Sequence, residues 1–199
     1  MKLYNPFRLC SRDNDVHNSD DEFLFHEQEL NSNLNNHNIQ RLQVKGDGNC
    51  LFYALAEGLI YEMKMDPDRF RLQLEAFGLL LDFRLVDFAN RLRQICVNEW
   101  KLNEQFYSQF VDTHKVSFLK EVKKFSKNGV SDSTLGDIVP LTISNTFNIK
   151  IIIFTSVSNL SRIEIKPANG NNASLPQKTI FLAYNQYGIG HYDAAYPRT

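Results

Sequence analysis

The distribution of apolar residues divides the chain into a polar beginning, a helical middle and a strand-rich end. Residues 11–38 are dominated by asparagine, aspartate and serine, and the Phe-Leu-Phe run at 23–25 interrupts them. A segment this polar buries too little apolar surface to fold by itself. We therefore predict a flexible polar tail over residues 1–38, followed by one folded domain over residues 39–199.

The middle of the chain has apolar residues at helical spacing. Beginning at Leu51 they recur every three or four residues, which predicts a helix directly after a Gly-Asp-Gly turn. A longer stripe runs from Phe77 to Ile95, where core packing is the default interpretation. A further helical pattern covers residues 115–129 and predicts a helix that ends at Gly129.

Pro140 lies inside a further helical pattern, where proline is tolerated only in the first turn. If Asp137 is the N-cap, Pro140 occupies the third helical position, whose N–H has no partner within the helix. We therefore predict a helix whose N-cap is Asp137.

The end of the chain changes to patterns that are typical of strands. Short apolar or alternating segments there occupy residues 150–154, 162–165, 179–184 and 191–196. Residues 39–44 also alternate and indicate a short strand before the helices. Because helices come first and most strands later, the sequence favours an α+β fold with a sheet near its C-terminal end.

Composition narrows the functional classes. The chain has 199 residues and a formal net charge of −1, so it is long enough for a sizeable core and lacks the basic excess of a nucleic-acid-binding protein. No apolar run reaches the length of a membrane span, and residues 1–17 contain no apolar core of a secretory signal. We expect a cytoplasmic, monomeric protein that binds no nucleic acid and does not span a membrane.

The metal-binding and disulfide-forming residue types are sparse. Cys10, Cys50 and Cys96 are odd in number and far apart, which disfavours a disulfide framework or a Cys-x-x-Cys zinc site. The histidines of the polar beginning, at positions 17, 26 and 37, are widely spaced and indicate solvated side chains rather than a metal site. We therefore expect neither a metal nor an organic cofactor.

Cys50 stands at the predicted start of a helix, behind the sequence Gly46-Asp47-Gly48-Asn49. The partial positive charge and free N–H groups of a helix N-terminus favour a thiolate, the nucleophilic form of cysteine. Glycines allow backbone geometries that can point several N–H groups at one oxyanion. The alternative is that Cys50 is a small buried residue behind an ordinary turn.

His191 is the best candidate for a base that would serve this thiol. It follows a glycine-rich turn and opens a predicted strand, in which His191 and Asp193 share one face. A carboxylate in that position can accept a hydrogen bond from the imidazole and stabilise its protonated form. The competing interpretation is a surface histidine beside an aspartate at the start of a strand.

The segments around Cys50 and His191 together indicate a family more specifically than either segment does alone. The sequences DGNCLFYALA and HYDAAY, with DIVPLTISNTFNIKIIIF and TIFLAY between them, resemble the ovarian-tumour (OTU) family of cysteine proteases over roughly residues 40–197. The resemblance implies a papain-like α+β fold with a central, mostly antiparallel sheet flanked by helices. It also implies a deubiquitinase that hydrolyses isopeptide bonds after the C-terminal glycine of ubiquitin.

The resemblance assigns a role to each matching residue. Cys50 would be the nucleophile, His191 the general base and Asp193 the residue that orients the imidazole. Asp47 would shape the loop before the nucleophile, and the backbone N–H groups of Asp47 and Cys50 would form the oxyanion hole. The neighbouring loop residues with a supporting role would be Gly48 and Asn49.

The expected partners are ubiquitin, polyubiquitin chains and ubiquitinated proteins. A narrow channel for the two terminal glycines of ubiquitin would be lined in part by Tyr187, Ile189 and Gly190. The chain departs from the family by a Leu135-Gly136 pair where many members have Trp-Gly, and by added helical length near residues 60–90, which is either core or a ubiquitin-contacting surface. An OTU-like protease for another ubiquitin-like modifier and a catalytically silent ubiquitin-binding module remain alternatives.

Overall fold

The computed structural model describes residues 19–111, 117–130, 133–168 and 178–198. Its principal helices are α1 Ser19–Asn36, α2 Cys50–Met65, α3 Phe70–Glu75, α4 Leu85–Leu102, α5 Glu104–Tyr107, α6 Phe118–Phe125 and α7 Val139–Phe147. Short 3₁₀ turns cover Ser108–Phe110 and Gly136–Ile138. The strands are β1 Ile39–Leu42, β2 Lys150–Thr155, β3 Arg162–Ile165, β4 Thr179–Asn185 and β5 His191–Pro197.

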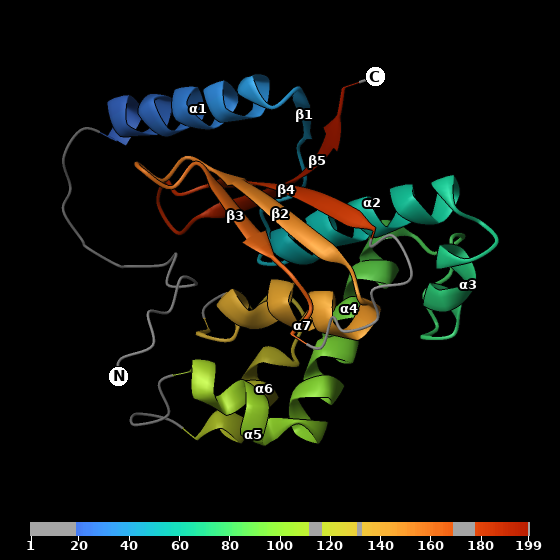
Figure 1. Ribbon diagram of the computed structural model, residues 1–199. Coiled ribbons are helices and arrows are strands. Elements are labelled where there is room, and N and C mark those ends of the chain that lie inside the picture. Colours follow the sequence, from blue (N-terminus) through green and yellow to red (C-terminus); the bar gives the residue numbers. More distant parts are fainter. Residues whose placement is uncertain (1–18, 112–116, 131–132, 169–177, 199) are drawn as a thin grey trace.

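The strands form a mixed sheet in the order β1-β5-β4-β2-β3. The β2–β4 pair is parallel, whereas β1–β5, β4–β5 and β2–β3 are antiparallel. The predicted α+β class with a mostly antiparallel sheet is therefore confirmed. Figure 1 shows α1 along one side of the sheet, with α7, α4, α6 and α5 on the other side.

Both faces of the sheet are buried at β2, which explains why this strand is a continuous apolar run. Alternate residues of a strand point to opposite faces. Ile151 and Ile153 face the main core, while Ile152 and Phe154 face a smaller cluster that contains Leu30 of α1. Helix α1 is therefore one of two layers that enclose the sheet.

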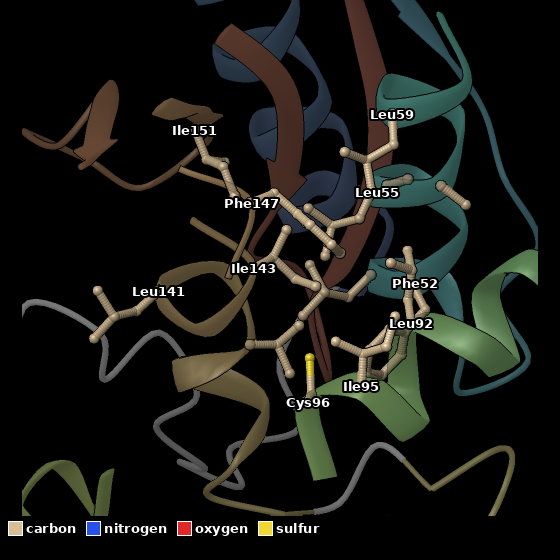
Figure 2. Packing of buried hydrophobic residues seen from close by; sticks show 14 of the residues in the cluster. Phe52, Leu55, Leu59, Leu92, Ile95, Cys96, Leu141, Ile143, Phe147 and Ile151 are labelled. Carbon is tan, nitrogen blue, oxygen red and sulfur yellow. The ribbon is translucent and has the colours of Figure 1, made fainter. Parts of the chain in front are cut away.

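The main core lies where α2, α4 and α7 meet the sheet. Figure 2 shows their apolar side chains converging, and the ones that it labels on these helices include Phe52, Leu55, Leu59, Leu92, Ile95, Ile143 and Phe147. Helix α2 lies beside β4 and β5 as well as α4. This packing fixes the N-terminal end of α2 relative to the beginning of β5, which carries His191.

The structure differs from the sequence prediction at the polar beginning of the chain. Residues 19–36 form a helix rather than a flexible tail, and residues 1–18 lie outside the described part. Leu30 and Leu34, one turn apart, are 0% and 3% exposed against the sheet. Acidic residues in the first turn also suit the positive end of the helix dipole. The segment is polar on average, and this average conceals the narrow apolar stripe that contains Leu30 and Leu34.

The stripe from Phe77 to Ile95 does not lie on a single helix. Gly78 adopts φ +73, and the N–H of Leu79 donates to the carbonyl oxygen of Leu74 at 3.2 Å, so a left-handed cap follows α3. Helix α4 begins only at Leu85. The later part of the stripe is buried in the main core, as the packing interpretation predicted.

Asp137 is not the N-cap of α7. A 3₁₀ turn over Gly136–Ile138 comes first, Ile138 occupies the cap position, and Pro140 is in the first turn of α7. The first turn still tolerates proline because its N–H groups have no partner within the helix. Within the described residues, no helix has both the length and the apolar character that crossing a bilayer requires.

Candidate active site

Cys50 is the first residue of α2 and is partly exposed. Asn49 stands at the cap position but makes no side-chain hydrogen bond to the free N–H groups of the first turn. Cys96 offers a contrast, because it is fully buried in α4 and points toward α7 (Figure 2). Burial raises the pKa of the Cys96 thiol far above its ordinary value. Of these cysteines, Cys50 has the exposure and position that a nucleophile needs.

The loop before Cys50 is ordered by its own side chains. Oδ1 of Asp47 accepts hydrogen bonds from the backbone N–H and the Nδ2 of Asn49, each at 3.1 Å. Oδ2 of Asp47 accepts another at 3.1 Å from the hydroxyl of Tyr53, one turn along α2. Asp47 therefore ties the loop to the first turn of the helix.

Gly48 is a glycine for both conformational and steric reasons. Its φ of +83 lies in the left-handed region, which disfavours side chains. A Cβ at this position would also overlap the carbonyl oxygen of Gly129, on the loop after α6. The backbone N–H of Gly129 donates a 3.1 Å hydrogen bond to Oδ1 of Asn49. The two loops therefore pack against each other at backbone distance.

A buried arginine holds this loop from the side of the core. Arg93 of α4 is 1% exposed, and its Nη2 donates to Oδ1 of Asn49 at 2.9 Å and to the carbonyl oxygen of Gly48 at 3.3 Å. Its Nη1 donates to the carbonyl oxygens of Phe125 and Val130, both at 3.0 Å. One guanidinium thus joins the loop before Cys50 to the segment that follows α6.

His191 and Asp193 lie on one face of β5, as the alternation predicted. Nε2 of His191 is 3.0 Å from Oδ1 of Asp193. An ionised carboxylate only accepts, so Nε2 carries the hydrogen and Nδ1 is the nitrogen left for Cys50. The hydrogen bond to Asp193, followed by the one to Cys50, raises the pKa of His191 to about 10, and partial burial opposes the shift.

Asp193 is 1% exposed and is held by groups other than His191 as well. Burial by itself would raise its pKa, but the hydrogen bond from His191, the N–H of Val44 at 2.8 Å and the charge of Arg41 outweigh burial, so the pKa is lowered. Asp193 is therefore an anion at neutral pH, which is the form that stabilises a protonated imidazole.

Known proteins resemble the chain in sequence and in fold. No family model matches the chain. The chain is 28% identical over 177 residues to OVARIAN TUMOR DOMAIN-containing deubiquitinating enzyme 11 of Arabidopsis thaliana. The matched residues are 88% of this chain and 57% of the relative. This chain is 24% identical over 178 residues to enzyme 10 of the same series and plant, with 89% and 40% covered. The chain thus spans about half the length of these relatives.

Solved structures share the fold. The OTU domain of OTUD1 superposes with a TM-score of 0.59 at 17% identity, over 88% of this chain and 97% of that domain. A ceOTUB1 chain from a complex with ubiquitin aldehyde and UBC13~Ub superposes with a TM-score of 0.62 at 15% identity, over 94% and 88%. The chain thus has the OTU fold, and its sequence resembles OTU-domain deubiquitinating enzymes.

The turn before His191 carries the predicted substrate-contacting residues of this OTU domain. The N–H of Gly190 donates to the carbonyl oxygen of Tyr187 at 3.1 Å, which closes the turn, and Gly190 has φ +79. Ile189 at its tip is 85% exposed. The ring of Tyr187 makes an edge contact with Phe23 of α1, with centroids 5.4 Å apart.

The two described histidines of the polar beginning, His26 and His37, bond to different backbone carbonyl groups. Nδ1 of His26 lies 3.2 Å from the carbonyl oxygen of Ser156, and Nδ1 of His37, just after α1, lies 2.8 Å from the carbonyl oxygen of Asn33 in that helix. His17 lies outside the described residues. Within those residues, no group of three or more His, Cys, Asp or Glu side chains is arranged to hold a metal ion.

Sequence reasoning missed three charged residues around the site of this OTU domain: Arg93, Arg41 and Glu27. No sequence signal marked Arg93, although it is buried in α4 together with the neighbouring Leu92. Arg41 alternates with outward residues in β1, and this pattern is the signal that could have marked it as inward-facing. Glu27 lies in α1, within the segment that the sequence predicts to be a flexible tail.

Proposed function

We propose that this OTU domain is a thiol-dependent deubiquitinase that cleaves isopeptide bonds after the C-terminal glycine of ubiquitin. The observation that carries the proposal is the order Cys50, His191, Asp193, in which a thiol at a helix N-terminus adjoins an imidazole held by a buried carboxylate. The curated relatives are named as deubiquitinating enzymes, which supports the same reaction class.

The first half of the reaction forms a thioester. A raised His191 pKa keeps the ring protonated at neutral pH, so the ring can pair with Cys50 once the thiol has lost its proton. The thiolate attacks the carbonyl carbon of the isopeptide bond and gives a tetrahedral oxyanion. His191 then donates its proton to the lysine nitrogen, the carbon–nitrogen bond breaks, and the amine leaves.

The second half of the reaction consumes water. Neutral His191 takes a proton from a water molecule, which attacks the thioester carbonyl. The carbon–sulfur bond breaks, ubiquitin leaves with a free carboxylic acid that releases its proton to solvent, and the thiolate and protonated imidazole are restored. Asp193 keeps the ring in the tautomer that presents Nδ1 to Cys50 throughout. This chemistry calls for no metal or organic cofactor.

The loop before Cys50 would hold the oxyanion. We assign this role to the backbone N–H groups of Asp47 and Cys50, with the Asp47 carboxylate, Gly48 and Asn49 keeping the loop in place. The exposed turn with Tyr187, Ile189 and Gly190 would line the entry for the ubiquitin tail. Donors held in advance of the reaction stabilise the oxyanion because they need no reorganisation as charge develops.

A ubiquitin probe with a C-terminal electrophile tests this proposal directly. We expect the wild-type protein to form an adduct one ubiquitin heavier, and Cys50→Ala to form none. Cys96→Ala is the matched control, because that thiol is buried in the core and its loss should leave labelling intact. Circular dichroism of each variant confirms that it is folded.

The other outcomes of this experiment decide between the alternatives. An adduct with a probe of another ubiquitin-like modifier, without one for ubiquitin, would replace the substrate and keep the chemistry. Folded wild-type protein that binds ubiquitin but labels with no probe would instead identify a silent binding module and contradict the proposal.

A further inference from the structure

We infer that helix α1 is part of the active-site architecture, in which Glu27 positions Asp193 by way of Arg41. The inference rests on the proposed function, because it concerns the residue that orients the catalytic imidazole. Glu27 and Arg41 act here as positioning residues and do not touch the substrate.

The sheet brings these side chains to one face. In the register, Arg41 of β1 is opposite Ala195 of β5, and Asn185 of β4 is opposite His191. Ala195 packs in the small cluster with Leu30 of α1, so this face of β5 is the one that α1 covers. His191 and Asp193, four and two residues before Ala195, are on the same face. The helix therefore lies over the face that carries the catalytic base.

Glu27 links two strands of that face. Nη1 of Arg41 donates to Oε2 of Glu27 at 2.9 Å and to Oε1 at 3.1 Å. Nδ2 of Asn185 donates to Oε1 of Glu27 at 2.5 Å. Nε of Arg41 donates to Oδ2 of Asp193 at 2.6 Å. A continuous chain of hydrogen bonds thus runs from α1 through β1 to the catalytic carboxylate.

The two carboxylate oxygens of Asp193 have different hydrogen-bond partners. Arg41 holds Oδ2, while Oδ1 accepts from His191 at 3.0 Å and from the N–H of Val44 at 2.8 Å. The side chains of Arg41 and Glu27 are only 13% and 22% exposed, so water screens them weakly. An arginine without Glu27 would leave a net positive charge beside Asp193 and compete with the imidazolium for it.

These contacts predict the sign of an electrostatic effect. The titratable groups around His191 are Asp193 from β5 and Cys50 from α2. Arg41 from β1 and Glu27 from α1 act on the ring through Asp193. Removing the charge of Glu27 leaves Arg41 uncompensated and should lower the pKa of His191. A helix that is merely docked through Glu27 would leave that pKa unchanged.

The decisive experiment follows the His191 ring by NMR as a function of pH. It uses the full chain with Cys50→Ala, so that the thiol does not titrate together with the ring. We expect Glu27→Gln to lower the pKa of His191 by about half a unit, and Glu27→Asp, which keeps the charge, to restore most of it. Glu29→Gln is the matched control, because it removes the same charge from an exposed side chain of the same helix.

A second parent variant, Arg41→Gln, tests whether Glu27 acts on His191 through Arg41. In Arg41→Gln protein, the additional Glu27→Gln change should move the pKa of His191 much less than it does alone. Equal shifts in both backgrounds, or a Glu27→Gln titration that superposes on that of Glu29→Gln, would overturn the inference. Helix α1 should stay docked in these variants, because Leu30, Leu34 and the 2.7 Å hydrogen bond from Asn33 to the carbonyl oxygen of Thr155 are untouched.

Activity separates this inference from the proposed function. With Cys50 intact, we expect Glu27→Gln to react several-fold more slowly with the ubiquitin probe than Glu29→Gln does. A wild-type protein that never labels would contradict the proposed function, while the NMR titration would still decide the role of Glu27. A labelled wild type with an unmoved His191 titration would contradict this inference alone.

Discussion

Arg93 donates a hydrogen bond of 2.9 Å to the side chain of Asn49, the residue that directly precedes the candidate nucleophile. The guanidinium is packed between two aromatic rings, 4.5 Å from the centroid of Phe52 and 4.6 Å from that of Phe125. Burial lowers its pKa to about 10, which leaves it charged at neutral pH. The site is thus anchored to the core by a cation that never reaches the surface.

Replacing Arg93 by methionine should therefore damage both stability and reactivity. The change leaves the side-chain oxygen of Asn49 and the carbonyl oxygens of Gly48, Phe125 and Val130 without their donor. We therefore expect a loss of about 2–4 kcal/mol in the free energy of unfolding. Arg84→Met is the control, because that side chain is 80% exposed and its loss should leave the free energy of unfolding almost unchanged. Chemical denaturation measures both, and equal effects would contradict the anchoring role.

Gly48→Ala should disrupt the loop before Cys50. The added Cβ would overlap the carbonyl oxygen of Gly129 and would force a left-handed residue into strain. We expect ubiquitin-probe labelling to slow on the order of 10²-fold, because the oxyanion donors would be displaced. Gly136→Ala is the comparison, since a Cβ there meets no atom within 4 Å. Unimpaired labelling of Gly48→Ala would refute the assigned loop geometry.

The His191 titration should also be visible in stability. Its pKa in the folded protein, about 10, lies above the ordinary 6.5, so protonation of the ring stabilises the fold. That contribution is present in full below about pH 6.5 and is lost as the pH rises through about 10. The stability difference between wild type and His191→Gln should shrink over this range. A difference that stays constant with pH would count against the raised pKa.

Leu30→Ala should loosen α1 from the sheet. The side chain is 0% exposed, and removing a buried leucine typically costs about 2–5 kcal/mol. Leu24→Ala, on the same helix with 52% exposure, should have little effect. Amide hydrogen exchange of residues 20–36 reports the result, with faster exchange expected only for Leu30→Ala. If both variants exchange like wild type, α1 is not held by this contact.

Short-range patterns were sufficient for most of the fold and for placing His191 and Asp193 on one face of a strand. The start of α2, the strand at residues 150–155 and the His191–Asp193 alternation each depend on residues a few positions apart. Periodicity and turn chemistry act over that same range. The break after Gly78 was also local, but the glycine signal was outweighed by the apolar stripe around it.

Tertiary packing alone decided the surroundings of the site. Glu27 and Asn185 are 158 positions apart, and Arg41 and Asp193 are 152 positions apart, so no sequence window contains either pair. An arginine in α4 and a glutamate in a polar segment look like solvated charges until the sheet and helices close over them. Local sequence specifies which backbone each residue adopts and which face it occupies. Which charges meet across those faces depends on how the layers pack, because that packing removes water and brings distant carboxylates and guanidinium groups to hydrogen-bond distance.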